Sequence, residues 1–349
     1  MELKILHEIN TEIREVYTEF LLQQPNSLFY QSLPYHELLK ELLGCQSIYF
    51  TYWKNSKPIA CLPFLYKQDE RMGTVLNSLP YYGSNGSFVF DSSLSESDRN
   101  QIKVGLIEAF ESSATCLNAS AYTVITNPLA EDDWATAGLQ FDYSDYRIGQ
   151  ITLLPYPKNN IEQELLKIFS DPRPRNIRRA RNAGITIEIR HDYEALSFLF
   201  GVHKQNIESI GGKAKKREFF EMIPKFFTPQ EYAVYVACKK KTPVAALLLF
   251  YFNKTVEYFT PATIPTFRND QPSALLIFEA MKDAIAKGFA YWNWGGTWKT
   301  QQGVYDFKKR WGAVDLKYNY YSTVLNKNLL KINREDLTSA FSDFYLFPF

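Results

Sequence analysis

The feature that most constrains this chain is an internal repeat, in which a pattern of the first half recurs 185 positions later. Residues 48–66 read as two apolar strands joined by a polar turn. Residues 233–251 have the same pattern, and Pro243 stands at the position of Pro58. The repeat predicts two β-hairpins, each with an apolar second strand near the centre of a sheet.

A strand, a helix and a further strand are expected after each hairpin. In the first half the helix covers residues 96–117 and the next strand 121–126. In the second half the helix covers 272–287, with Gly288 as its stop signal, and the strand 289–294. Duplication of one mixed α/β unit explains this order; chance likeness of two α/β stretches is the alternative.

The length of 349 residues favours two domains over a single core. Two prolines and two asparagines in 153–160 interrupt the periodicity, so we expect an N-terminal domain of residues 1–156 and a C-terminal domain of residues 157–349. A basic linking helix should follow, ending at Ala183-Gly184 before a strand over 185–190. This helix should begin at residues 174–176, and the basic segment around it holds five arginines: Arg173, Arg175, Arg178, Arg179 and Arg181.

Composition excludes several classes of protein. The formal net charge of +1 gives no global field for duplex DNA. The four cysteines show no metal or redox spacing. The acidic N-terminal segment does not resemble a signal peptide, and no apolar run is long enough to form an integral membrane segment. We therefore expect a cytoplasmic protein.

Three sequence runs carry a resemblance to a known family: NSLPYYG at 77–83, RNIRRA at 175–180 and FKKRWG at 307–312. With the repeat, they resemble the Fem-type branch of the GNAT acyltransferase superfamily over most of residues 45–325. That branch includes aminoacyltransferases that build peptidoglycan side chains and relatives that acylate amines from acyl-CoA. The resemblance implies an α/β fold with mixed sheets, two tandem GNAT-like domains, and a cleft where donor and acceptor meet.

The resemblance implies that Phe307 and Lys308 are catalytic, at the donor end of a cleft in the second half. Lys308 would stabilise the oxyanion or the donor's phosphate or ribose; a solvated lysine is the alternative. The candidates for substrate binding are Tyr81, Tyr82, Asn85, Arg175, Arg178 and Trp294. The candidates for a general base are Glu257, Tyr258, Tyr305 and Asp306.

Each set of substrate-binding candidates is proposed for a different reason. The glycine-rich run at 81–86 resembles a loop that borders the acceptor site, and an ordinary tight connection is the alternative. Guanidinium groups suit phosphates, although a charged helix is often simply solvated. Trp294 shares a strand face with Trp292, so it lines either the cleft or the core.

The acyl donor stays open between acyl-CoA and aminoacyl-tRNA. Arg268 and Asn269 stand where a GNAT protein would wrap the CoA pyrophosphate, and they are the candidates for cofactor binding. No glycine occurs in 268–272, so a close backbone cradle for that group is disfavoured. We expect no metal.

The sequence therefore predicts an N-acyltransferase or aminoacyltransferase that acts on an amine of a cell-envelope or surface-glycan precursor. The partners expected are a small-molecule or nucleotide-linked glycan precursor and, as a candidate donor, charged tRNA. No histidine lies in a recognisable triad motif, so direct transfer in a ternary complex is favoured. The alternatives are an acyl-CoA-dependent N-acetyltransferase of a nucleotide-linked amino sugar and a noncatalytic GNAT-like ligand-binding protein.

Overall fold

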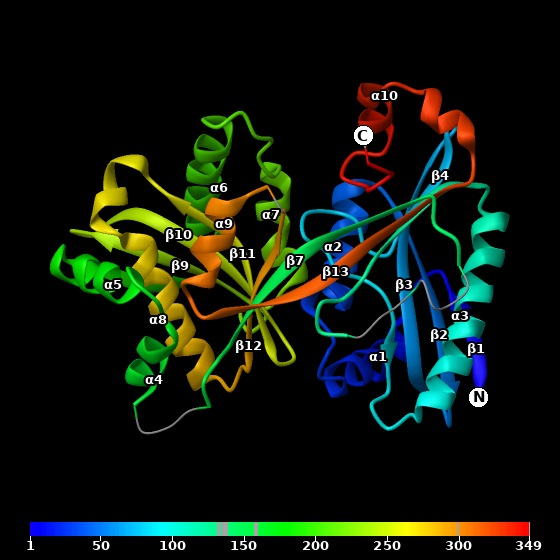
Figure 1. Ribbon diagram of the computed structural model, residues 1–349, viewed down its shortest axis with the longest axis horizontal. Helices are drawn as coiled ribbons and strands as arrows, with labels where there is room; N and C mark the ends of the chain where they lie inside the picture. Colours follow the sequence, from blue (N-terminus) through cyan, green and yellow to red (C-terminus); the bar gives the residue numbers. More distant parts are fainter. Residues whose placement is uncertain (131–133, 135–138, 157–159, 299, 349) are drawn as a thin grey trace. The chain divides into compact units, whose positions relative to one another are not determined.

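The computed structural model (Figure 1) describes the chain except residues 131–133, 135–138, 157–159, 299 and 349. The chain divides into two compact units, of which the first is Met1–Arg147 with Lys317–Phe349 and the second is Ile148–Leu316. This division differs from the expected domains at two places, because residues 148–156 belong to the second unit and the C-terminal residues belong to the first. The last residues belong to the first unit because β13 (Ala313–Val324) pairs with β6 (Ala119–Ile125) there.

The first unit is a mixed sheet in the order β1-β2-β3-β4-β6-β13, with the short β5 on β3. Among its described strands, only β4 and β6 are parallel neighbours. Its other strands are β1 (Glu2–Leu6), β2 (Gln46–Lys54), β3 (Lys57–Asp69), β4 (Gly73–Asn77) and β5 (Val89–Phe90). Its helices are α1 (Thr11–Gln23), η1 (Phe29–Gln31), α2 (Leu33–Leu43), α3 (Glu96–Cys116), η4 (Lys327–Lys331) and α10 (Arg334–Ala340).

The second unit has its own mixed sheet, in the order β7-β12-β11-β10-β9-β8, with β11 and β12 parallel. Its strands are β7 (Tyr143–Leu153), β8 (Ile185–Arg190), β9 (Tyr232–Lys239), β10 (Thr242–Phe252), β11 (Thr255–Thr263) and β12 (Tyr291–Thr297). Its helices are α4 (Ile161–Ile168), α5 (Arg173–Asn182), α6 (Tyr193–Glu208), α7 (Arg217–Phe226), η3 (Pro265–Asp270), α8 (Pro272–Ala286) and α9 (Gln302–Lys309).

The two units repeat one topology, which confirms the duplicated α/β fold with mixed sheets. Each has an edge strand, two helices, a hairpin, a third strand, a helix and a parallel strand. Both hairpins turn through two residues with positive φ, Asn55-Ser56 and Lys240-Lys241. Both second strands also bulge beside a proline, at Ile59 and at Val244, which are 185 positions apart.

One helix in each unit carries the main core. In Figure 1, α3 packs on β2 and β3, and α8 packs on β9 and β10. In the first unit Phe64 stacks on Phe110 of α3, with 4.3 Å between ring centroids. In the second unit Phe278 and Met281 of α8 are fully buried against the sheet. A third cluster packs η4 and α10 on β4 and β6, which holds the chain's end to the first unit.

Two strands are exchanged between the halves of the sequence. β7 follows the first repeat along the chain, but its residues 148–153 pair with β12 in the second unit. β13 follows the second repeat, but its residues 320–324 pair with β6 in the first unit. Each sheet is therefore completed by a strand that comes from beyond its own repeat.

His36 is a buried histidine of α2 whose charge is disfavoured. Its Nε2 donates to the carbonyl oxygen of Tyr30 at 2.9 Å, and its Nδ1 accepts from the hydroxyl of Tyr49 at 3.0 Å. Desolvation lowers the pKa of His36 from 6.5 to about 3. The ring therefore stays neutral in the folded protein at mildly acidic pH.

Acid is expected to destabilise the protein through His36. The unfolded chain binds this proton near pH 6.5 and the folded chain only near pH 3, so the stability is complete above pH 6.5 and is lost as pH falls toward 3. We expect a loss of about 2 kcal/mol in the free energy of unfolding between pH 7.5 and pH 5 from this group. Urea denaturation of the wild type and of His36→Gln at both pH values measures it. An equal loss in the two proteins would contradict the assignment.

Candidate active site

The parallel strand pair of the second unit separates along its length. β11 and β12 pair at three positions, ending with Glu257 opposite Asn293. Immediately beyond, β11 bulges against β10 at residues 258–260. In the described part of the chain, the rest of β11 has no pairing with β12. Strands that diverge in this way leave backbone groups available to a ligand.

The first unit fills the corresponding separation with its own chain. Beyond Asn77, which lies opposite Thr123, the amide of Gly86 donates to the carbonyl oxygen of Ile125 at 3.0 Å. The Asn77 side chain donates to and accepts from the backbone of Tyr345, at 2.8 and 2.7 Å. The second unit is therefore the better place for a ligand between the strands.

Lys308 lies beneath β12 with its ammonium group fully engaged. Its Nζ donates to the carbonyl oxygens of Gly295 and Gly296, at 3.2 and 3.0 Å, and to Oγ1 of Thr297 at 2.9 Å. Three acceptors satisfy its three N–H groups. The side chain is 6% exposed, and desolvation lowers the pKa of Lys308 from 10.5 to about 8.

A bulge in β12 creates this arrangement. Gly295 has φ of +70°, a value that favours glycine, and the pairing of β12 with β7 shifts between Asn293 and Gly296. The bulge turns two consecutive carbonyl groups toward one ammonium. Gln150 of β7 secures it, because its Oε1 accepts from Oγ1 of Thr297 at 2.9 Å and its Nε2 donates to the carbonyl oxygen of Tyr305 at 3.2 Å.

Arg173 is a second buried cation, at the start of α5. Its guanidinium lies 4.4 Å from the ring centroid of Phe307 and 5.1 Å from that of Trp311. Its Nη2 donates to the carbonyl oxygen of Phe307 at 3.1 Å. Desolvation, together with the nearby charge of Arg310, lowers the pKa of Arg173 to about 10. Arg173 thus holds Phe307, the residue before Lys308.

The two cations are not neutralised locally. Within the described residues neither Lys308 nor Arg173 contacts a carboxylate. The partly exposed groups close to them are Phe307, Tyr258 and the Gly295-Gly296 backbone. A buried positive charge acts across a low dielectric, so it stabilises nearby negative charge more strongly than an exposed one. The site is suited to a developing oxyanion or to a phosphate.

The other predicted residues of the second unit fall into two groups. Trp294 is 3% exposed and donates from its indole N–H to Oγ1 of Thr152 at 2.9 Å, so it supports the site from the core. Arg175 and Arg178 are exposed on the face of α5 opposite the buried Ile177. Among the residues that the structure describes, neither has an ion-pair partner, whereas Arg181 pairs with Glu162 and Glu279.

Tyr81, Tyr82 and Asn85 lie in the first unit, in the segment that fills its strand separation. Tyr81 and Asn85 are each 2% exposed, while Tyr82 is partly exposed. Asn85 Nδ2 donates to the carbonyl oxygen of Thr126 at 2.9 Å. Asn85 therefore holds its loop to the end of β6, and of the three only Tyr82 keeps accessible surface.

The two equivalent helices differ at the end where an anion would bind. Arg268 and Asn269 are exposed in η3, just before α8, whose first turn holds no acidic residue and whose N-cap, Gln271, makes no side-chain cap. In contrast, α3 is capped by Ser95 and carries Glu96 and Asp98 in its first turn. Acidic side chains there repel a phosphate, so only α8 is suited to one.

The general-base candidates are dispersed. Tyr305 donates its hydroxyl to Asp315 at 2.7 Å, and Asp306 accepts from Gln302 Nε2 at 2.8 Å. Glu257 is 1% exposed, on the sheet face opposite α8. Burial raises the pKa of Tyr258, and Arg173 partly offsets this. Of the four, Tyr258 alone combines partial exposure with closeness to both the strand separation and a buried cation.

Sequence reasoning missed Gln150 and Thr297, which position the ammonium of Lys308. They come from β7 and β12, and only the register of these strands brings them together. No local motif marks either residue.

The described residues contain no group of three or more His, Cys, Asp or Glu arranged to hold a metal ion. In that same part of the chain, no helix is long and apolar enough to cross a membrane.

Comparisons with known proteins bear on the fold. Residues 174–309, from α5 to α9, match the acetyltransferase (GNAT) domain family. The chain is similar to the crystal structure of FemX, with a TM-score of 0.74 and 17% identity over 95% of this chain and 99% of that one. No curated protein sequence matches it significantly.

Two further solved structures have the same architecture. One is a C-terminal domain assigned to a lysylphosphatidylglycerol synthetase from Agrobacterium fabrum, with a TM-score of 0.58, 13% identity and 96% of each chain covered. The other is a tandem GNAT protein from the clavulanic acid biosynthesis pathway, with a TM-score of 0.53, 8% identity, and coverage of 92% of this chain and 98% of that one. At such identities the likeness concerns the fold.

Proposed function

We propose that this chain, whose fold is like that of FemX and of a tandem GNAT protein, transfers an acyl or aminoacyl group to an amine of a cell-envelope or surface-glycan precursor. The observation that supports acyl transfer is the pair of buried cations, Lys308 and Arg173, beside the separated strands β11 and β12. Acyl transfer to an amine develops negative charge on the carbonyl oxygen, and this site favours negative charge.

In the proposed reaction the amine nitrogen attacks the donor's carbonyl carbon. The new C–N bond forms, the carbonyl oxygen becomes an oxyanion, and the bond to the leaving oxygen or sulfur then breaks. Lys308 fixes the backbone of Gly295 and Gly296 and supplies positive potential at the developing oxyanion. Arg173 holds Phe307 as a wall of the same site. The proton released by the amine passes to water or to a substrate group.

An aminoacyl donor is favoured within this proposal. FemX and a lysylphosphatidylglycerol synthetase share the fold, and the latter by its name attaches lysine, an aminoacyl group. A charged tRNA also offers phosphates to the exposed Arg175 and Arg178. Acyl-CoA would instead place its pyrophosphate near Arg268 and Asn269, where glycine is lacking.

A binding and turnover screen of the purified protein tests the proposal. We expect a complex with aminoacyl-tRNA, and transfer of the labelled aminoacyl group to an amine of a nucleotide-linked muropeptide, followed by mass spectrometry. Arg178→Ala should weaken tRNA binding by about threefold to tenfold and reduce its salt dependence, while the exposed Lys254→Ala serves as a one-charge control.

The outcomes separate the candidate functions. Tight binding of acyl-CoA and acetylation of a nucleotide-linked amino sugar would move the assignment to small-molecule N-acetylation. Binding of a donor or acceptor without transfer would support a noncatalytic protein. Equal tRNA affinity in Arg178→Ala and in the Lys254 control would remove the α5 face from donor binding.

A further inference from the structure

Two edge strands present open hydrogen-bonding sides. β1 lies at the end of the strand order in the first unit, and β8 lies at the end in the second. Among the strands that the structure describes, none pairs with the outer side of either. Such edges expose N–H and C=O groups and are templates for pairing with another chain.

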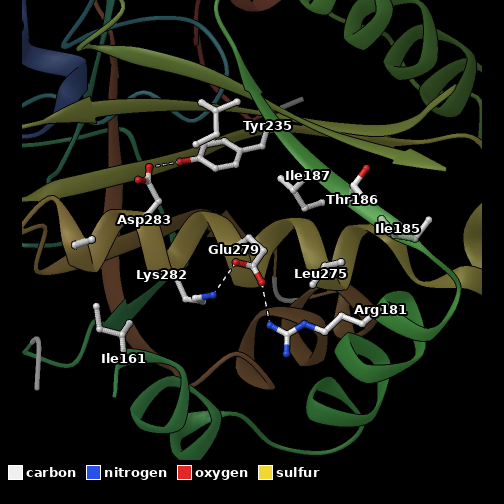
Figure 2. A pocket seen from close by; sticks show the side chains of 12 residues that line it. Ile161, Arg181, Ile185, Thr186, Ile187, Tyr235, Leu275, Glu279, Lys282 and Asp283 are labelled. Atoms are coloured by element: carbon white, nitrogen blue, oxygen red, sulfur yellow. Dashed lines mark hydrogen bonds and ion pairs between the residues drawn. The ribbon is translucent and has the colours of Figure 1, made fainter. Parts of the chain in front are cut away.

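An apolar groove of about 630 Å³ lies along β8 (Figure 2). Its apolar residues are Ile161, Ile185, Ile187, Ile189, Leu275 and Ala286. Its charged residues all have partners: Glu279 accepts from Arg181 and Lys282, and Asp283 accepts from the hydroxyl of Tyr235. The groove therefore offers apolar surface to a partner, with Ile189 47% exposed.

β1 carries a pattern that matches this edge. Leu3 and Ile5 are 38% and 42% exposed and share one face, which is the α3 face because they lie opposite Tyr52 and Phe50. Glu2 and Lys4 point to the other face. On β8 the isoleucines likewise share the α8 face.

We propose that β1 of one copy pairs antiparallel with β8 of a second copy, with Lys4 opposite Glu188. This register also sets Glu2 opposite Arg190, Leu3 opposite Ile189, and Ile5 opposite Ile187. Two pairs of opposite charge lie on one face, and the apolar pairs lie on the other. Leu3 and Ile5 would then cover the groove beside β8.

The duplication makes this register compatible with backbone hydrogen bonding. Lys4 lies opposite Thr51 in its own sheet, and Glu188 lies opposite Val236. Val236 is the residue that matches Thr51 in the repeat, 185 positions later. Lys4 and Glu188 therefore occupy equivalent positions in the two sheets. Their backbone N–H and C=O groups have the same orientation relative to the unpaired side of β1 and of β8. Opposed residues in an antiparallel pair must match in this respect.

Pairing of identical strands fits less well. With full overlap, two copies of β1 would oppose Lys4 to Lys4, which is a like-charge contact. Two copies of β8 would oppose Ile187 to Glu188 and so mix the apolar and charged faces. The contact between copies is therefore expected to join unlike strands. Because each copy offers both, association can continue beyond a dimer.

Charge exchange tests the register by sedimentation velocity from low to high micromolar concentration. The wild type should form larger species as its concentration rises. Lys4→Glu and Glu188→Lys should each weaken the association by about tenfold, and the double variant should restore it. Far-ultraviolet circular dichroism confirms that each variant keeps its fold.

Two further results bear on the proposal. Ile189→Lys places a charge on the exposed apolar face of β8 and should abolish association, whereas Val104→Lys, at a position 50% exposed on α3, should not. A wild type that stays monomeric at every concentration would overturn the proposal, as would a double variant no better associated than the single ones. None of these readouts depends on the acyltransfer activity.

Discussion

Replacing Lys308 by methionine is expected to lower turnover by about 100-fold or more while the protein stays folded. The substitution keeps an unbranched side chain that is one atom shorter and removes the ammonium group. Two carbonyl groups and the hydroxyl of Thr297 lose their donor, so the bulge of β12 is no longer held. Steady-state kinetics on the substrate found in the screen would give kcat and KM separately, and the loss should fall mainly on kcat.

The neighbouring lysine is the matched control for this prediction. Lys309 is exposed and pairs with Asp315 at 3.1 Å, so Lys309→Met should change turnover little. The pH dependence gives a second readout. Lys308 is charged below its pKa of about 8, so wild-type turnover should fall as pH rises through 8, and Lys308→Met should lack this decline. Unchanged turnover in the folded variant would remove Lys308 from the mechanism.

Trp311→Ala is expected to destabilise the protein by about 3–5 kcal/mol. Trp311 is fully buried in the main core of the second unit, and its ring centroid lies 4.9 Å from that of Phe169 and 6.1 Å from that of Trp294. Its removal leaves a cavity and takes one aromatic contact from Arg173. Chemical denaturation monitored by circular dichroism measures the change.

Two comparisons make that result informative. Tyr156→Ala removes an aromatic ring that is 83% exposed, so it should alter the free energy of unfolding by less than about 0.5 kcal/mol. Trp311→Phe keeps most of the ring and should recover more than half of the lost stability, because the indole N–H has no acceptor among the described residues. Equal stability of Trp311→Ala and wild type would contradict a packing role.

Local patterns predicted much of the fold. The hairpins, the helices α3 and α8, and the strand β8 follow from periodicity, turn residues and stop signals that act within a few positions. The exchange of β7 and β13 was not predicted, because strand partners far apart in sequence leave no local trace. For that reason the C-terminal residues were expected in the second domain and lie in the first unit.

The candidate site was predicted in part. The resemblance pointed to Phe307 and Lys308, but it did not show that the ammonium would be enclosed by a bulged strand. Arg173 was one of five arginines for which phosphate contact and simple solvation were both left open; it is buried because the face of α5 that holds Ile177 turns toward the core. Arg175 and Arg178 lie on the exposed side of the same helix.

The strand exchange has a consequence for how the chain folds as it is synthesised. When the first repeat has left the ribosome, β6 still lacks its neighbour β13, whose residues 320–324 follow the second repeat. Its sheet keeps an open edge until the second repeat has been made as well. The two halves, although they arose by duplication, therefore do not fold one after the other as independent modules, and a cut at the linker would leave each with an incomplete sheet.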